Sequence, residues 1–223
     1  MTRTPLKERK MPDYTRGEEI MNMVTHIVGG SAGVIILIAS VVVSSLGGNP
    51  WAIVSSAIYG FSMVALYTVS SVYHGLHLNM GKRVMQVIDH CTIYMLIAGT
   101  YTPILLVGIR PVHPVTAWII FGAEWGLAAL AATLTAIDLK KYVKFSMACY
   151  IIMGWMVVLN IKPVVEAMTW SGFAWLLAGG VSYTIGAVLY GIGRKKKYFH
   201  SVFHIFVNIG SLLQAVSIIF YIL

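Results

Sequence analysis

Histidines at helical spacing are the residues of this sequence whose types most clearly suggest chemistry. His200 and His204 are four residues apart, so both side chains would project from one face of a helix. Ser70 and His74 have the same spacing, and Asp89 follows them along the chain. Two histidines one turn apart can bind one metal ion, and a third completes a three-nitrogen set. His74, His200 and His204 are therefore candidate ligands of zinc.

A three-histidine set leaves room for a reaction at the metal. Catalytic zinc sites combine three protein ligands with a water molecule, whereas structural zinc sites usually have four protein ligands. Asp89 is the candidate to hold or deprotonate that water molecule. The segment from His200 to His204 has no glutamate between its histidines, so the metalloprotease motif is absent. The alternative is that these polar groups only form hydrogen bonds between helices.

Another polar cluster stands at the start of the first apolar stretch. Glu19, Asn22 and His26 have spacings of three and four, which place them on one helix face. Asn208 continues the face of His204. All four are candidates to hold the metal ligands in place. Helix capping explains Glu19 equally well, and His26 can also serve as a hydrogen-bonding group between helices.

The elements that must position these residues are long apolar stretches. Hydrophobic residues make up 58% of the 223 residues and charged residues 11%, against roughly 45–50% and 25% in a soluble domain. A membrane-crossing helix needs about 20 mostly apolar residues. The sequence predicts an all-α, seven-transmembrane-helix bundle at residues 20–223, after a tail at residues 1–19. The seven stretches cover residues 20–46, 51–73, 87–108, 114–136, 143–160, 170–192 and 198–222.

The positions of the basic residues predict the orientation. The net charge of +8 could indicate nucleic acid, but 14 of the 16 lysines and arginines lie in the N-terminal tail and in alternate loops. Such residues stay on the cytoplasmic side, so the N-terminus is predicted inside and the C-terminus outside. The basic residues could also touch anionic headgroups, and nothing in their pattern favours nucleic acid. They are Arg3, Lys7, Arg9, Lys10, Arg16, Lys82, Arg83, Lys140, Lys141, Lys144, Arg194, Lys195, Lys196 and Lys197.

This topology places the chemical groups at one membrane depth. The helix that ends near His74 runs inward, whereas the helices that start near Glu19, Asp89 and His200 begin inside. Four helices therefore bring histidines and carboxylates to the cytoplasmic side, and this convergence favours a shared site. The predicted topology depends only on the lysines and arginines, so the shared depth of the histidines and carboxylates is an independent observation.

The same residues resemble the motifs of the progestin and adipoQ receptor (PAQR) family, and most closely its bacterial haemolysin III branch. The resemblance covers essentially the whole chain. It implies seven helices, an N-terminus inside, and a zinc ion near the cytoplasmic surface bound by His74, His200 and His204, with Asp89 and Ser70 beside it. The matching motifs are Glu19-x-x-Asn22-x-x-x-His26, Ser70-x-x-x-His74, Asp89 within residues 88–94, the segment 98–103, and His200-x-x-x-His204.

Two functions are consistent with these features. The family is similar to alkaline ceramidases in its motifs, which implies a zinc-dependent hydrolase of a lipid amide or ester with Asp89 and Ser70 as catalytic residues. The alternative is a non-enzymatic sensor or regulator of membrane lipid state, in which zinc holds the helices together. A pore-forming cytolysin is disfavoured, because seven apolar spans leave no water-soluble form of a toxin. Membrane lipids are the expected partners, and the bacterial plasma membrane is the expected location.

Overall fold

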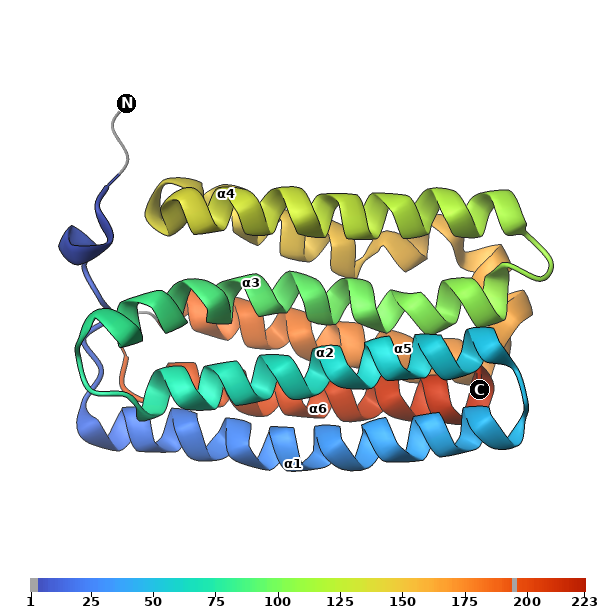
Figure 1. The fold of residues 1–223 in the computed structure, drawn as a ribbon, viewed down its shortest axis with the longest axis horizontal. Coiled ribbons are helices and arrows are strands. Elements are labelled where there is room, and N and C mark those ends of the chain that lie inside the picture. Colours follow the sequence, from blue (N-terminus) through green and yellow to red (C-terminus); the bar gives the residue numbers. More distant parts are fainter. Residues whose placement is uncertain (1–3, 194–195) are drawn as a thin grey trace.

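The computed structural model describes residues 4–193 and 196–223 as a bundle of long helices with roughly parallel axes (Figure 1). Within these two ranges the regular structure is helical throughout. Arg3, Arg194 and Lys195, which the charge pattern assigns to the cytoplasmic side, lie outside the described residues.

The first two helices form a hairpin. Helix α1 spans Arg16–Leu46 and α2 spans Pro50–Gly75. Gly48 has a φ of +66°, which glycine adopts without steric cost, and this lets the chain reverse within three residues. Asn49 then caps α2, since its side chain accepts a hydrogen bond from the Trp51 N–H at 3.0 Å. Because the turn is short, the end of α2 returns to the start of α1, and His74 lies there.

The third helix changes its winding after a proline. Helix α3 spans Met80–Pro103 and continues as a π-helix, η2, over Ile104–Ile109. Pro103 has no N–H to donate, so the regular hydrogen-bonding ladder cannot pass through it unchanged. The π-helix contacts α2, α3, α4 and α5, so it lies inside the bundle.

The region from residue 114 onward contains two interruptions. Helix α4 spans Pro114–Gly154 with a non-helical backbone at Asp138. A short helix, η3, spans Met156–Asn160, and α5 spans Ile161–Ile192 with a left-handed residue at Thr169. The last helix, α6, spans Phe199–Tyr221.

Five segments are long and apolar enough to cross a membrane. One of them is the 79-residue run Pro114–Ile192, which as a straight helix would be about 120 Å long. That is about four times the hydrocarbon thickness. Figure 1 shows that the chain turns back within this run. The predicted stretches 143–160 and 170–192 fall after the interruptions at Asp138 and Thr169.

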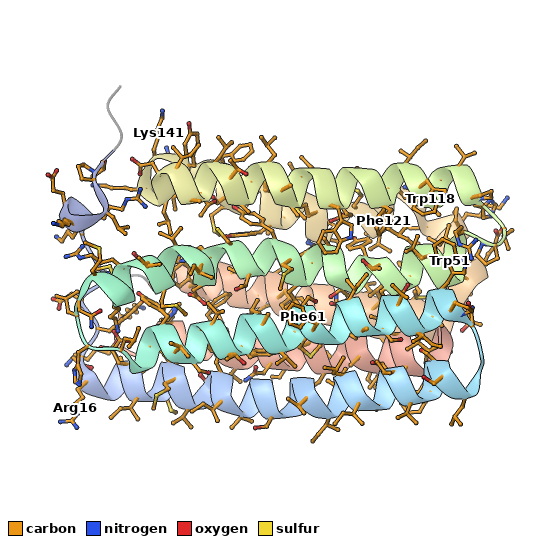
Figure 2. All side chains as sticks on the ribbon, viewed as in Figure 1. Arg16, Trp51, Phe61, Trp118, Phe121 and Lys141 are labelled. Carbon is orange, nitrogen blue, oxygen red and sulfur yellow. The ribbon has the colours of Figure 1, made fainter. Side chains whose placement is uncertain are left out.

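The surface and the two ends of the bundle differ in character. Val28, Ile35 and Phe61 are more than 60% exposed on the outside, an arrangement that suits contact with lipid. Figure 2 shows Arg16 and Lys141 at one end and Trp51 and Trp118 at the other. The start of α1 and the C-terminus also lie at opposite ends (Figure 1). We call the end with Arg16 and Lys141 the basic end.

Candidate metal centre and cavity

Three histidines from two helices meet at the basic end. His74 ends α2, and His200 and His204 occupy the first two turns of α6. One ring nitrogen of each lies within 4.8 Å of the other two, and Nε2 of His74 is 3.3 Å from Nε2 of His200. His74 and His204 are each 2% exposed. The structure thus brings together the three residues that the sequence predicts as metal ligands.

Hydrogen bonds on the far side of two rings leave their inner nitrogens free for a metal. Nδ1 of His74 lies 2.6 Å from a carboxylate oxygen of Glu19. An ionised carboxylate only accepts, so Nδ1 carries the hydrogen and Nε2 keeps its lone pair. Nδ1 of His204 lies 3.2 Å from the Asn22 carbonyl oxygen, which sets the same tautomer. A carboxylate or carbonyl behind a histidine is the usual outer partner of a zinc ligand.

One pair of these nitrogens has the spacing expected of two ligands of a tetrahedral zinc ion. Zinc–nitrogen bonds of about 2.0–2.1 Å imply neighbouring nitrogens roughly 3.3 Å apart. The His74–His200 separation of 3.3 Å matches this value. The cluster is therefore compatible with a metal ion held by three neutral imidazoles.

Glu19 is itself held in place by a second contact. Its other carboxylate oxygen lies 2.7 Å from Nζ of Lys82, which also donates to the Leu76 carbonyl oxygen at 3.0 Å. The side chain of Lys82 is only 8% exposed, so this ion pair is poorly screened by water. Glu19 thereby links α1, the end of α2 and the start of α3.

A capping box fixes the direction in which α1 leaves this site. The Glu18 N–H donates to Thr15 Oγ1, and the Thr15 N–H donates to Glu18 Oε2 at 2.9 Å. Glu18 Oε1 also accepts from the Tyr198 N–H at 2.9 Å, one residue before α6 begins. Thr15-x-x-Glu18 is a readable capping signal in the sequence, but the contact of Glu18 with the start of α6 appears only in the structure.

The remaining candidates from α1 and α6 pack around the cluster. Asn22 is fully buried, and its Oδ1 accepts from Ser201 Oγ at 2.6 Å. His26 stacks on His204 with ring centroids 3.5 Å apart. Asn208 lies one turn beyond His204 and donates to the Thr25 carbonyl oxygen at 2.8 Å, so it ties α6 to α1.

A cavity of about 190 Å³ opens on the inner side of the histidines. Asp89 and Ser70 line it together with His200 and His204. The Asp89 side chain is 15% exposed, and Ser70 Oγ is buried with no hydrogen-bond partner among the described residues. Both predicted catalytic residues therefore face the same space as two of the predicted ligands.

The cavity is polar at the cluster and apolar along its length. It runs beside α3 from Asp89 to Tyr101, a distance of about 18 Å along the helix. Ile93, Leu96 and Val207 line the middle. Tyr101 OH donates to the Gly154 carbonyl oxygen and accepts from the Val157 N–H at 2.8 Å, so it satisfies the backbone where α4 ends. A hydrocarbon chain with a polar head matches this distribution.

Comparison with known proteins shows which family the chain belongs to. The family model described as "Haemolysin-III related" matches residues 14–215. "Hemolysin-3" of Bacillus cereus is 36% identical over 217 residues, which cover 97% of this chain and 97% of that protein. "Hemolysin-3 homolog" of Bacillus subtilis (strain 168) is 33% identical over 208 residues, 93% of this chain and 96% of that protein. The chain belongs to the haemolysin III family.

The haemolysin III assignment confirms the resemblance found in the motifs. The human "Monocyte to macrophage differentiation factor" is 27% identical over 179 residues, 77% of this chain and 71% of that protein, which fits the wider PAQR family. The family and the five apolar helices of sufficient length identify this chain as a multi-pass membrane protein of the bacterial cell membrane.

Two residues of this haemolysin III site were missed in the sequence. His90 lines the cavity, and its Nδ1 lies 2.8 Å from the Gln86 carbonyl oxygen. Helical spacing does not indicate His90, because a residue next to Asp89 points about 100° away on a helix, but the cavity is wide enough to reach both. Tyr14 stacks on His200 with centroids 5.2 Å apart. No helical spacing could have indicated it, because Tyr14 precedes α1.

Proposed function

We propose that this protein is a zinc-dependent hydrolase that cleaves an amide or ester bond of a membrane lipid at the basic end of the bundle. The observation that carries the proposal is the opening of the three-histidine cluster onto an apolar cavity that Asp89 and Ser70 also line. Zinc, when bound, would polarise the carbonyl of the lipid and activate water.

The residues of the chain divide the remaining tasks. His74, His200 and His204 hold the ion, and Glu19 keeps the ring of His74 in place. Asp89 orients the attacking water, accepts its proton and delivers it to the leaving group. The Ser70 hydroxyl, which has no partner among the described residues, is available to donate a hydrogen bond to the lipid carbonyl, and the apolar walls of the cavity take the hydrocarbon part of the lipid.

We also propose seven membrane crossings with the N-terminus in the cytoplasm. The interruptions at Asp138 and Thr169 support this count, since they divide a run that is too long for one crossing. The start of α1 and the C-terminus lie at opposite ends, which requires an odd number of crossings. Basic residues such as Arg16 and Lys141 at the basic end favour that end as the cytoplasmic one.

The test is a metal analysis followed by a search for turnover. Purified protein should carry about one zinc ion per chain, and His200→Ala and His204→Ala should each lower this content strongly. A panel of lipid amides and esters in mixed micelles, followed by mass spectrometry, should then show cleavage that stops when zinc is removed.

A sensor or regulator with a structural metal is the second candidate. The observation that favours it is that the cluster joins α2 to α6 and, through Glu19, to α1 and α3. Zinc bound at full occupancy without cleavage of any lipid on the panel would replace the hydrolase proposal with this one.

A further inference from the structure

The chain before α1 crosses the basic end and is attached far from the histidines. We call residues 4–15 the N-terminal strap. Its Thr4 N–H donates to Asp138 Oδ2 at 3.1 Å, and a guanidinium nitrogen of Arg9 donates to the Ile137 carbonyl oxygen at 2.7 Å. Arg83 in turn donates to the Arg9 carbonyl oxygen. The strap is therefore fixed to the interruption of α4 and to the first turn of α3.

Arg9 is the anchor of the strap. The residue is 5% exposed although it lies in a segment without long regular structure, while its neighbour Lys10 is exposed. A guanidinium is buried only at a substantial desolvation cost, which its hydrogen bonds and the nearby Asp138 carboxylate offset. A flexible tail would leave such a group in water.

The other end of the strap lies over the histidine cluster. The Tyr14 ring is parallel to His200, with centroids 5.2 Å apart and planes 13° apart, and its centroid is 6.0 Å from that of His74. The next residue, Thr15, is the N-cap of α1, so the capping box fixes the angle at which Tyr14 arrives.

We infer that the N-terminal strap is a cover that closes the aqueous side of the histidine cluster, with Tyr14 as the cover and Arg9 as its anchor. A compound dissolved in water must displace Tyr14 to reach the histidines. Tyr14 does not line the apolar cavity, which reaches His200 and His204 from among α2, α3, α4 and α5. The closed strap therefore selects against water-soluble reactants and leaves the approach through the cavity open. The inference rests on the proposed metal site, and it concerns access to that site rather than the reaction.

The experiment measures how fast a water-soluble chelator removes the metal. Full-length protein loaded with zinc is mixed in detergent with EDTA in excess, and the zinc that remains bound is followed over time. Tyr14→Ala and Arg9→Ala should each speed the loss by about tenfold or more, because each removes contacts that hold the strap closed. Tyr14→Phe keeps the stacked ring, and Lys10→Ala removes an equal charge from an exposed neighbour. Both controls should stay within about twofold of the unaltered protein.

A second measurement needs no metal. Diethylpyrocarbonate modifies accessible neutral imidazoles, and the rate of modification at His200 can be read by mass spectrometry in the metal-free protein. This rate should rise in Tyr14→Ala and in Arg9→Ala but not in the controls. Variants are compared below their unfolding temperatures, and if one alanine variant fails to fold, the other carries the test.

The outcomes separate the two proposals. An unaltered protein that never binds zinc overturns the metal site, while the modification of His200 still tests the strap. Zinc that binds normally, together with equal rates in all variants in both measurements, overturns the strap inference alone.

Discussion

At the scale of single residues, Glu19 connects the histidine cluster to a buried lysine. Its two carboxylate oxygens contact Nδ1 of His74 at 2.6 Å and Nζ of Lys82 at 2.7 Å. The first contact sets the tautomer of His74, and the second supplies a positive charge that keeps the carboxylate ionised. Helix capping, the alternative reading of Glu19, is instead provided by Glu18 with Thr15.

Replacing Glu19 by glutamine should weaken metal binding without removing a ligand. The amide keeps the size of the side chain but loses the charge and offers only one acceptor oxygen. Outer partners of metal-bound histidines typically contribute 10- to 100-fold in affinity, so we expect Glu19→Gln to weaken zinc binding by about that factor. Competition with a zinc-binding dye measures it. Glu8→Gln is the matched control on an exposed residue, and equal affinities of the two variants would contradict the proposed role of Glu19.

Replacing Asp89 by asparagine should affect the reaction without removing the metal. If a cleaved lipid is found, Asp89→Asn should lower turnover by about 10²- to 10⁴-fold, the usual contribution of a general base, while most of the zinc stays bound. Turnover and zinc content are measured on the same preparation. Loss of the metal together with the activity would show instead that Asp89 maintains the site.

At the scale of helices, much of the site could be predicted and some of it could not. The spacing of Ser70 with His74 and of His200 with His204 sets which side chains share a helix face, and the apolar stretches show where those helices lie. Spacing says nothing about segments without regular structure, so the positions of Tyr14 and Arg9 could not be predicted. The cavity also escaped prediction, because its middle is lined by apolar residues from several helices, and the sequence does not show which apolar residues line a cavity and which face lipid.

The close contact of α1 and α2 depends on a glycine. A Cβ at Gly60 would lie 2.7 Å from the Leu37 Cα, which belongs to the backbone of α1 and cannot move aside cheaply. Gly60→Ala should therefore separate the two helices, at a cost of about 1–3 kcal/mol, and lower the unfolding temperature in detergent.

The matched control for this prediction is Gly122→Ala. A Cβ at Gly122 meets nothing within 4 Å among the described residues. Alanine has the higher helix propensity, so this variant should be neutral or slightly more stable. An unfolding temperature of Gly60→Ala at or above that of Gly122→Ala would show that the hairpin tolerates a wider spacing.

At the scale of the whole molecule, charge and aromatic residues mark the two ends of the bundle. Lys82 and Arg83 lie in the first turn of α3, and Lys141 lies just after the interruption of α4. At the opposite end Arg110 lies 4.1 Å from the centre of the Trp51 ring. Hydropathy could predict the long helices, but turns inside the run Pro114–Ile192 depend on the backbone at Asp138 and Thr169, which apolar composition does not reveal.

The orientation of the chain in the membrane can be tested with reporter fusions. Alkaline phosphatase is active only outside the cytoplasm, so a fusion after Leu223 should be active in a bacterial host, and a fusion after Lys82 should be inactive. A fluorescent protein that folds only in the cytoplasm should show the opposite pattern at the same two positions. A phosphatase fusion after Asn49, in the first turn at the other end, is the control that the reporter can be exported from an internal position. An inactive fusion at Leu223 with an active one at Lys82 would show that the orientation is the reverse of the proposed one. It would also place the histidine cluster on the outer side, because His74, His200 and His204 lie at the end of the bundle where α3 begins.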